Sequence, residues 1–272
     1  MVAAFVIFLR EGVEASMIVA IILAYLNRIG RRDLFRDIAI GVGVALGLAA
    51  LAGVAVYLTI RTYADTRVQS IVEACTYLSA AAVLTYMTFW MRSHARHLSA
   101  ELRGRVDSAV SGRTRIGLSV LAGQAVGREG VETAVFTLAI AFSTSRARLL
   151  GGGLAGLLVA LAIAFVIYRL GHRINLARFF STVGTLLTLF AAGLLVDAVE
   201  NFQRLGWLPF LTRPLWHSGS VLRETTTLGD VLHSFFGYAE SPTLLQVLTY
   251  AGYAAVVVAL FLRRPRAAAS GA

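Results

Sequence analysis

The sequence contains no lysine and one cysteine, and only 15 of its 272 residues are acidic. Without lysine the chain has no Gly-x-x-x-x-Gly-Lys phosphate loop, which excludes an ATP-driven pump built from this chain alone. A single cysteine, Cys75, allows neither an internal disulfide nor a zinc-type cysteine spacing. The Gly-x-Ser-x-Gly and His-Glu-x-x-His motifs are also missing, so we expect no enzyme and assign no catalytic residue.

Apolar residues are in excess and fall into long runs. Hydrophobic residues make up 57% of the chain and charged residues 15%, whereas a soluble domain has roughly a quarter of its residues charged. The runs do not alternate as barrel strands would, and helices satisfy their own backbone groups in lipid. We therefore predict an all-α integral membrane protein with about seven transmembrane helices. The predicted spans are Val2–Leu26, Ile38–Ile60, Val68–Met91, Ile116–Phe142, Leu149–Leu170, Phe179–Val199 and Leu244–Leu262.

The arginines predict the orientation of these spans. If the N-terminus is outside, 16 arginines lie in the inner loops and the C-terminal tail, and seven lie in the outer loops. Positive residues accumulate on the cytoplasmic side of membrane proteins. This distribution favours a multi-pass protein of the cell membrane with its N-terminus outside and its C-terminus in the cytoplasm. Because the basic residues sit in short loops beside the lipid bilayer, we expect no nucleic-acid partner.

One hexapeptide occurs twice. Residues 10–15 are Arg-Glu-Gly-Val-Glu-Ala and residues 128–133 are Arg-Glu-Gly-Val-Glu-Thr, each near the middle of a predicted span. Three spans separate the copies, so the second copy is inverted in the membrane, as in 3+3 inverted repeats. We predict one transmembrane domain over residues 1–272. Its parts are repeat 1 (about 2–91), repeat 2 (about 116–200), an outer loop (201–243), helix seven (244–262) and a tail (263–272).

The repeated motif places charge at bilayer depth, where each charged side chain costs at least ~2.5 kcal/mol. Within each copy the two glutamates are three residues apart and share one helix face. Glu11, Glu14, Glu129 and Glu132 are therefore candidate metal ligands, with Arg10 and Arg128 as their motif partners. Four glutamates and two arginines leave a charge of −2, which requires a cation. Oxygen ligands select hard ions, among them ferric iron, magnesium, calcium and manganese. The alternative is that the arginines only neutralise the glutamates in a packed bundle.

Three further acids are expected near the outer surface. Glu73 begins the third predicted span, and Asp197 and Glu200 end the sixth, so the three could form an electronegative vestibule through which cations reach the membrane. We interpret His217 and His233 of the outer loop as solvated residues.

Two pairs of glycines have the spacing that lets membrane helices approach closely. Gly43 and Gly47 lie in the second predicted span, and Gly152 and Gly156 lie in the fifth. Met87 is expected to be a packing or lipid-facing residue rather than a metal ligand.

The duplicated Arg-Glu-Gly-Val-Glu resembles the Arg-Glu-x-x-Glu motif of the oxidase-dependent iron permeases, a family of fungal high-affinity iron permeases and bacterial EfeU-type proteins. The likeness extends over nearly the whole chain. It includes Leu-Thr-Tyr-Met-Thr-Phe-Trp-Met at 84–91, Ala-Ala-Gly-Leu at 191–194, Gly-Trp-Leu-Pro at 206–209 and Phe-Gly-Tyr-Ala-Glu-Ser-Pro at 236–242.

The resemblance implies high-affinity uptake of ferric iron into the cytoplasm, with the four motif glutamates as ligands. It also implies an iron-oxidising partner protein outside the membrane, and Fe(III) as the transported substrate rather than a permanently bound cofactor. Two alternatives remain open at this point. One is a transporter of another hard or divalent cation, and the other is a membrane sensor that binds iron without moving it.

Overall fold

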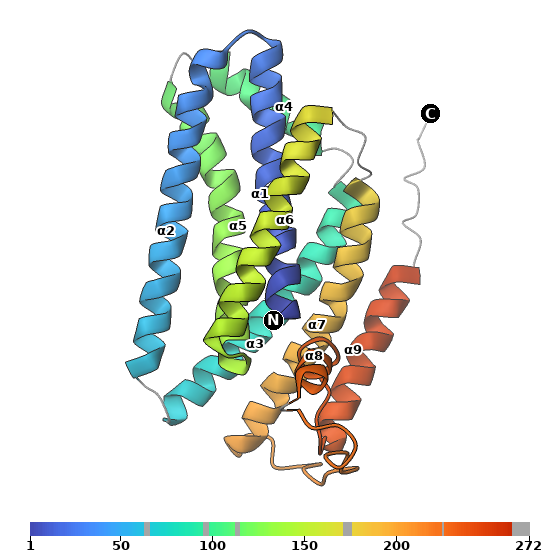
Figure 1. The fold of residues 1–272 in the computed structure, drawn as a ribbon. Coiled ribbons are helices and arrows are strands. Elements are labelled where there is room, and N and C mark those ends of the chain that lie inside the picture. Colours follow the sequence, from blue (N-terminus) through green and yellow to red (C-terminus); the bar gives the residue numbers. More distant parts are fainter. Residues whose placement is uncertain (63–65, 95–97, 112–114, 171–175, 225, 263–272) are drawn as a thin grey trace.

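The computed structural model describes residues 1–62, 66–94, 98–111, 115–170, 176–224 and 226–262. Within these ranges the chain is helical and forms no β-strand, apart from an isolated bridge between Pro214 and Thr243. The elements are α1 (Val2–Arg28), η1 (Arg32–Leu34), α2 (Phe35–Thr62), α3 (Arg67–His94), α4 (Leu98–Ser111), α5 (Arg115–Ser143), α6 (Arg146–Leu170), α7 (Leu176–Arg204), α8 (Thr227–Phe236) and α9 (Leu244–Leu262). They build an elongated bundle (Figure 1).

Each of the seven apolar runs lies within one long helix, so the prediction of an all-α protein is confirmed. The sequence reading did not predict α4. This short, charged helix caps one end of the bundle, next to the turn between α1 and α2 (Figure 1). The predicted tail, 263–272, lies outside the described residues.

The outer helices present apolar side chains to their surroundings. Leu48 and Leu51 of α2 are 62% and 69% exposed, and Leu154 and Leu158 of α6 are similarly open. Four helical stretches are long and apolar enough to cross a membrane: Arg32–Thr59, Arg67–Met91, Arg146–Val166 and Thr182–Arg204. Helices α1 and α5 are not among these four, and each carries an arginine and two glutamates within five residues. An apolar exterior of this extent is what a lipid solvent requires.

The helices pack in three intimate pairs, α1 with α6, α2 with α5, and α3 with α7. Small residues at four-residue spacing make the first two pairs possible. On α6 these are Gly152, Gly156 and Ala160, and on α2 they are Gly41, Ala45 and Ala49. The prediction for Gly152 and Gly156 is therefore confirmed. The one for Gly43 and Gly47 is wrong, because a methyl group at either position would meet nothing within 4 Å.

The Gly156→Ala variant is expected to destabilise the bundle. The added Cβ would lie 2.4 Å from the backbone oxygen of Phe5, so α1 and α6 would have to separate. Overpacking of this kind costs about 1–3 kcal/mol. Thermal unfolding of the detergent-purified protein measures the loss. Gly43→Ala is the matched control in α2 and should leave the melting temperature unchanged or higher. Equal melting temperatures for the two variants would contradict this packing.

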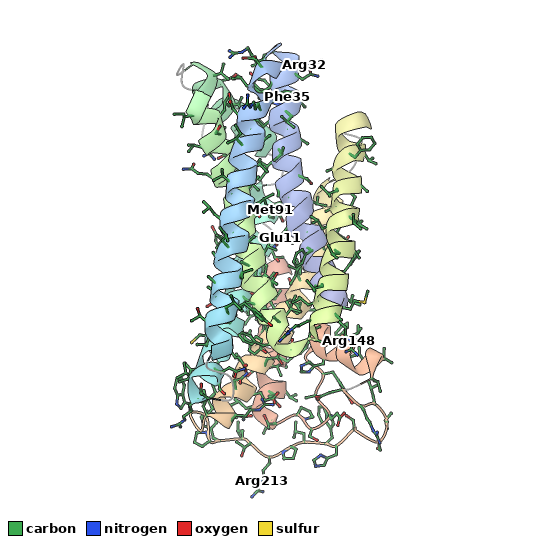
Figure 2. The ribbon with its side chains drawn as sticks, turned by 60° about the vertical axis from the view of Figure 1, so that its left-hand side comes forward. Glu11, Arg32, Phe35, Met91, Arg148 and Arg213 are labelled. Atoms are coloured by element: carbon green, nitrogen blue, oxygen red, sulfur yellow. The ribbon has the colours of Figure 1, made fainter. Side chains whose placement is uncertain are left out.

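Two buried apolar clusters lie at different heights along α1 and α5. One includes Ile7 of α1 and Phe136 of α5, together with residues of α3 and α7. The other includes Ile22 of α1 and Leu118 of α5, together with residues of α2 and α4. The first cluster contains residues that precede the motif in α1 and follow it in α5. The second cluster contains residues that follow the motif in α1 and precede it in α5. The two motif copies therefore lie between the clusters. The charged residues are thus held at mid-height (Figure 2, where Glu11 is labelled).

The segment after α7 folds back over the opposite end from α4 (Figure 1). Helix α8 begins at the cap Thr226, whose hydroxyl accepts a hydrogen bond from the Gly229 amide at 3.1 Å. It ends at Gly237, whose φ of 60° suits glycine and whose added Cβ would lie 3.1 Å from Gly193 Cα of α7. Glu224 and Glu240 close the loop, since each carboxylate accepts the other residue's backbone amide, at 2.7 and 2.6 Å. These contacts fix α8 against α7.

Candidate metal site

Helices α1 and α5 bring three motif carboxylates together. Glu11, Glu129 and Glu132 each place one oxygen within 4.8 Å of the other two. Two oxygen ligands of one ion about 2.1 Å away lie up to about 4.2 Å apart. If each carboxylate oxygen moved by less than about 1 Å, the three side chains could bind one cation. Carboxylates of both motif copies thus lie side by side, and Glu14 stands outside this trio.

The two arginines are used differently. Arg10 is 3% exposed and lies between both glutamates of its own copy, with Nη1 2.7 Å from Glu11 Oε1 and Nε 3.0 Å from Glu14 Oε1. The side chain of Arg128 is 43% exposed, and its one ion pair within the described part of the chain is with Glu132, at 3.0 Å. Among the described residues, Glu129 has no cationic group within 4.0 Å. The first copy is therefore neutralised more fully than the second.

Helix α3 explains this difference. The Arg128 guanidinium donates to Met87 Sδ at 2.9 Å and lies 4.9 Å from the centre of the Trp90 ring. Met87 is buried, as predicted for a packing residue, but its contact with the motif arginine was not foreseen. These contacts draw Arg128 away from Glu129 and towards α3, which leaves one motif carboxylate available to a ligand.

Each of the four motif glutamates has a buried oxygen without a hydrogen bond: Oε2 of Glu11, Glu129 and Glu132, and Oε1 of Glu14. The Glu14 oxygen is near Arg10 but is not aligned with it for a hydrogen bond. A buried polar atom without a partner costs about 1–3 kcal/mol, and more when it is charged. A bound cation could satisfy unpaired carboxylate oxygens of this kind.

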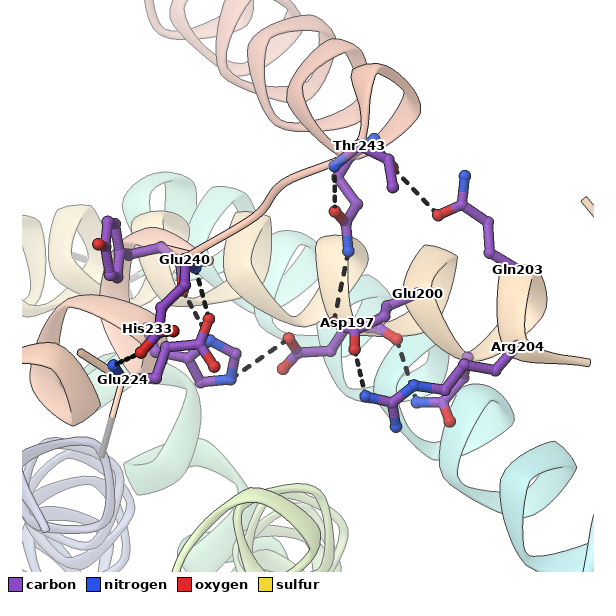
Figure 3. Close-up of polar contacts among 11 residues, drawn as sticks. Asp197, Glu200, Gln203, Arg204, Glu224, His233, Glu240 and Thr243 are labelled. Carbon is purple, nitrogen blue, oxygen red and sulfur yellow. Dashed lines mark hydrogen bonds and ion pairs between the residues drawn. The ribbon is translucent and has the colours of Figure 1, made fainter. Parts of the chain in front are cut away.

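The three outer acids are divided between two groups. Glu73 lines a pocket of about 420 Å³ between the ends of α3 and α7, where Gln69 donates to Glu73 Oε1 at 2.7 Å. Asp197 and Glu200 lie one turn apart on α7. Glu200 pairs with Arg204, which lines the same pocket, and accepts from Gln246 of α9 at 3.4 Å. Glu73 therefore lies near Arg204 and Glu200, and Figure 3 shows Asp197 and Glu200 beside α8 and the loop that follows it.

Asp197 has a partner on α8 that the sequence pattern does not indicate. His233 of α8 places Nε2 3.7 Å from Asp197 Oδ1, while its Nδ1 lies 2.8 Å from the carbonyl oxygen of Tyr238 (Figure 3). Burial disfavours the imidazolium, but Asp197 and the Tyr238 carbonyl outweigh that effect and raise the pKa of His233 above its ordinary value. The interpretation of His233 as a solvated loop residue is therefore wrong. His217 is exposed and bonds to Ser241.

The membrane-length helices define a multi-pass membrane protein that carries a buried cluster of carboxylates between two of its helices. The model of the Iron permease FTR1 family matches residues 1–272, and the chain belongs to that family. It is 32% identical to the Ferrous iron permease EfeU of Yersinia pestis over 270 residues, covering 98% of this chain and 95% of the relative. It is also 32% identical to the Ferrous iron permease EfeU of Escherichia coli strain UTI89 over 273 residues, covering 98% and 97%.

No solved structure matches the chain. The family makes this protein an iron permease rather than an enzyme, so the predictions of an iron permease family and of iron transport are confirmed.

Proposed function

We propose that this protein carries ferric iron from the outside into the cytoplasm through a site made by the two Arg-Glu-x-x-Glu copies. Glu11, Glu129 and Glu132 are the ligands in the described arrangement, and Glu14 is a fourth that reaches the ion when Arg10 shifts. The observation that supports this most is the set of four buried carboxylate oxygens without hydrogen-bond partners. A hard cation would satisfy the free oxygens of Glu11, Glu129 and Glu132 and offset the charge of −2 that remains after the two arginines are counted.

We further propose seven membrane crossings, arranged as two inverted repeats of three and one C-terminal helix. The packing supports this arrangement, because the motif helix of each repeat pairs with the middle helix of the other repeat. A methyl group at Gly12 would lie 2.7 Å from Ala160, and one at Gly130 would lie 2.7 Å from Ala49. Each motif glycine thus faces the third small residue of its partner helix, as a pseudo-two-fold axis requires.

The same arrangement supports alternating access around a fixed site. Apolar clusters close the bundle on both sides of the motif, so the ion site is shielded from both ends in this conformation. Iron would enter from the end that carries α8, past Glu73, Asp197 and Glu200, and leave at the end that carries α4. This direction follows from the N-terminus being outside, which the excess of arginines at the α4 end supports.

The oxidation state of the transported ion has two candidates. An all-carboxylate site favours ferric iron, which is the harder ion. Ferrous iron is the second candidate, because the curated relatives are named ferrous iron permeases. If iron arrives as Fe(II) and crosses as Fe(III), a protein outside the membrane must oxidise it. The family resemblance is the support for that partner.

Vesicles that contain the purified protein test this function. Radioactive iron is supplied as Fe(III) in one assay and as Fe(II) in another. Iron is expected to accumulate in the vesicles when it is supplied as Fe(III), and Glu14→Gln is expected to reduce this uptake. Accumulation from Fe(II) alone would transfer the proposal to the ferrous candidate. Binding without accumulation of either ion would indicate a sensor or a need for the oxidising partner. Uptake of manganese in preference to iron would contradict the selectivity.

A further inference from the structure

We propose that His233 and Asp197 form a second cation site at the outer end of the bundle, where a divalent first-row metal such as ferrous iron binds before it reaches the motif glutamates. This inference rests on the proposed function for its place in the transport route. The pair joins two consecutive helices, α7 and α8 (Figure 3). Its carboxylate was expected from the sequence to attract cations, but its imidazole was not.

The orientation of the imidazole leaves one nitrogen for a metal. The Tyr238 carbonyl can only accept a hydrogen bond, so Nδ1 of His233, 2.8 Å away, carries the hydrogen. In the neutral ring Nε2 is then a bare lone pair, and it faces Asp197. A histidine that donates one ring N–H to a carbonyl and presents the other nitrogen is the usual arrangement of a metal-binding histidine.

The distance fits two ligands of one ion better than a hydrogen bond. Nε2 and Oδ1 are 3.7 Å apart, beyond hydrogen-bonding range. Two ligands about 2.1 Å from one ion lie about 3.4 Å apart in tetrahedral geometry and about 3.0 Å apart at the right angle of octahedral geometry. The pair therefore needs to close by less than about 1 Å to hold a metal.

The surroundings favour a positive charge at this point. Burial disfavours a positive charge at His233, but the nearby carboxylates of Asp197, Glu224 and Glu200 all favour one. The side chains of His233 and Asp197 are 24% and 15% exposed, so an ion could reach them from outside and still be partly desolvated.

Two contacts hold α8, and with it His233, in place. Gly237 packs against Gly193 of α7, and the hydrogen bond from the Gly229 amide to Thr226 fixes the other end of α8.

The ligand types of the two sites favour different metals. A site with an imidazole and a carboxylate suits borderline divalent metals, whereas a site of glutamates alone suits harder ions.

The test is metal binding by the full-length protein in lipid nanodiscs without oxygen. Manganese(II) alone is the spectroscopic probe, read by pulsed electron paramagnetic resonance for nitrogen coordination, and ferrous iron alone is counted by equilibrium dialysis. The key variant is His233→Asn, because the asparagine amide can still donate to the Tyr238 carbonyl but offers no ligand at Nε2. His217→Asn is the control on the same loop.

The expected result is a nitrogen signal in the wild-type protein and in His217→Asn that disappears in His233→Asn. Affinity at this site should fall at least about tenfold in His233→Asn and in Asp197→Asn. Glu129→Gln should leave the signal intact. An unchanged signal in His233→Asn, or none in the wild type, would overturn the inference and leave a plain ion pair.

The dialysis separates this inference from the proposed function. If Glu129→Gln binds one ion fewer than the wild type and His233→Asn binds the same number, the outer site is refuted and the proposed function is not. If His233→Asn binds one ion fewer and Glu129→Gln still takes up iron normally, the outer site is supported and the function proposed for the motif is refuted.

Discussion

The Glu129→Gln variant is expected to lose iron uptake, by at least about 100-fold, while keeping its folded bundle. Glu129 is 5% exposed and belongs to the carboxylate trio, yet no arginine approaches it within 4.0 Å among the described residues. The amide preserves the shape of the side chain but removes one negative charge and one strong oxygen ligand. The net charge of the motif residues changes from −2 to −1, so less of the charge of a trivalent ion is offset.

The stability of this variant should change in the opposite direction. In the protein without iron, Glu129 adds a buried carboxylate that has no cationic partner, so its neutral replacement removes a desolvation cost. The melting temperature without iron is therefore expected to stay the same or rise. Iron should stabilise the wild type by about 2.7 kcal/mol at 100 times the dissociation constant, and this gain should disappear in the variant.

Two measurements decide the outcome: iron uptake into vesicles, and thermal unfolding with and without iron. Glu101→Gln is the matched control, because it makes the same chemical change on α4, away from the carboxylate trio. Normal uptake by Glu129→Gln would exclude the motif as the transport site. A lower melting temperature without iron would mean that Glu129 has a structural role instead.

The sequence was sufficient for the long helices and for the meeting of the two motif copies. Apolar length alone predicts a helix in lipid, and a repeated motif in helices of opposite direction predicts a shared centre. It was not sufficient for helix α4, since that helix is short and charged. Its buried Leu102 and Val106, four residues apart, were the signal that could have found it.

The roles of individual residues depend on neighbours that are distant in the sequence. Arg10 and Arg128 have the same local sequence, but only Arg128 meets Met87 and Trp90 of α3. Likewise, no spacing rule links His233 to Asp197, because the packing of α8 and of its cap Gly237 against α7 brings the two residues together.

The choice of helix face was equally hidden. Helix α2 contains several overlapping pairs of small residues, and only the set that includes Gly41 faces α5. Patterns of this kind predict that two helices approach closely, but they do not identify the face.

The two motif arginines are expected to differ strongly in their effect on stability. Arg10→Gln would leave the buried Glu11 and Glu14 without a counter-charge, a change that typically costs about 3–5 kcal/mol. Arg128→Gln removes one ion pair from a side chain that is 43% exposed, so it should cost no more than about 1–2 kcal/mol, including the contact with Trp90. Arg10→Gln should therefore melt at a much lower temperature or fail to accumulate in the membrane.

A double variant shows whether charge is the reason. In the Arg10→Gln, Glu14→Gln double variant, a neutral amide replaces one of the two buried carboxylates that lost their counter-charge. Part of the lost stability should therefore return. The coupling free energy between the two substitutions is expected to be about 0.5–3 kcal/mol. Yield in the membrane and thermal unfolding of the single and double variants measure this coupling. Equal effects of Arg10→Gln and Arg128→Gln, or a double variant less stable than Arg10→Gln alone, would refute the asymmetry. Recovery would mean that Arg10 holds the first copy together before iron arrives, whereas the second copy keeps Glu129 free for the ion.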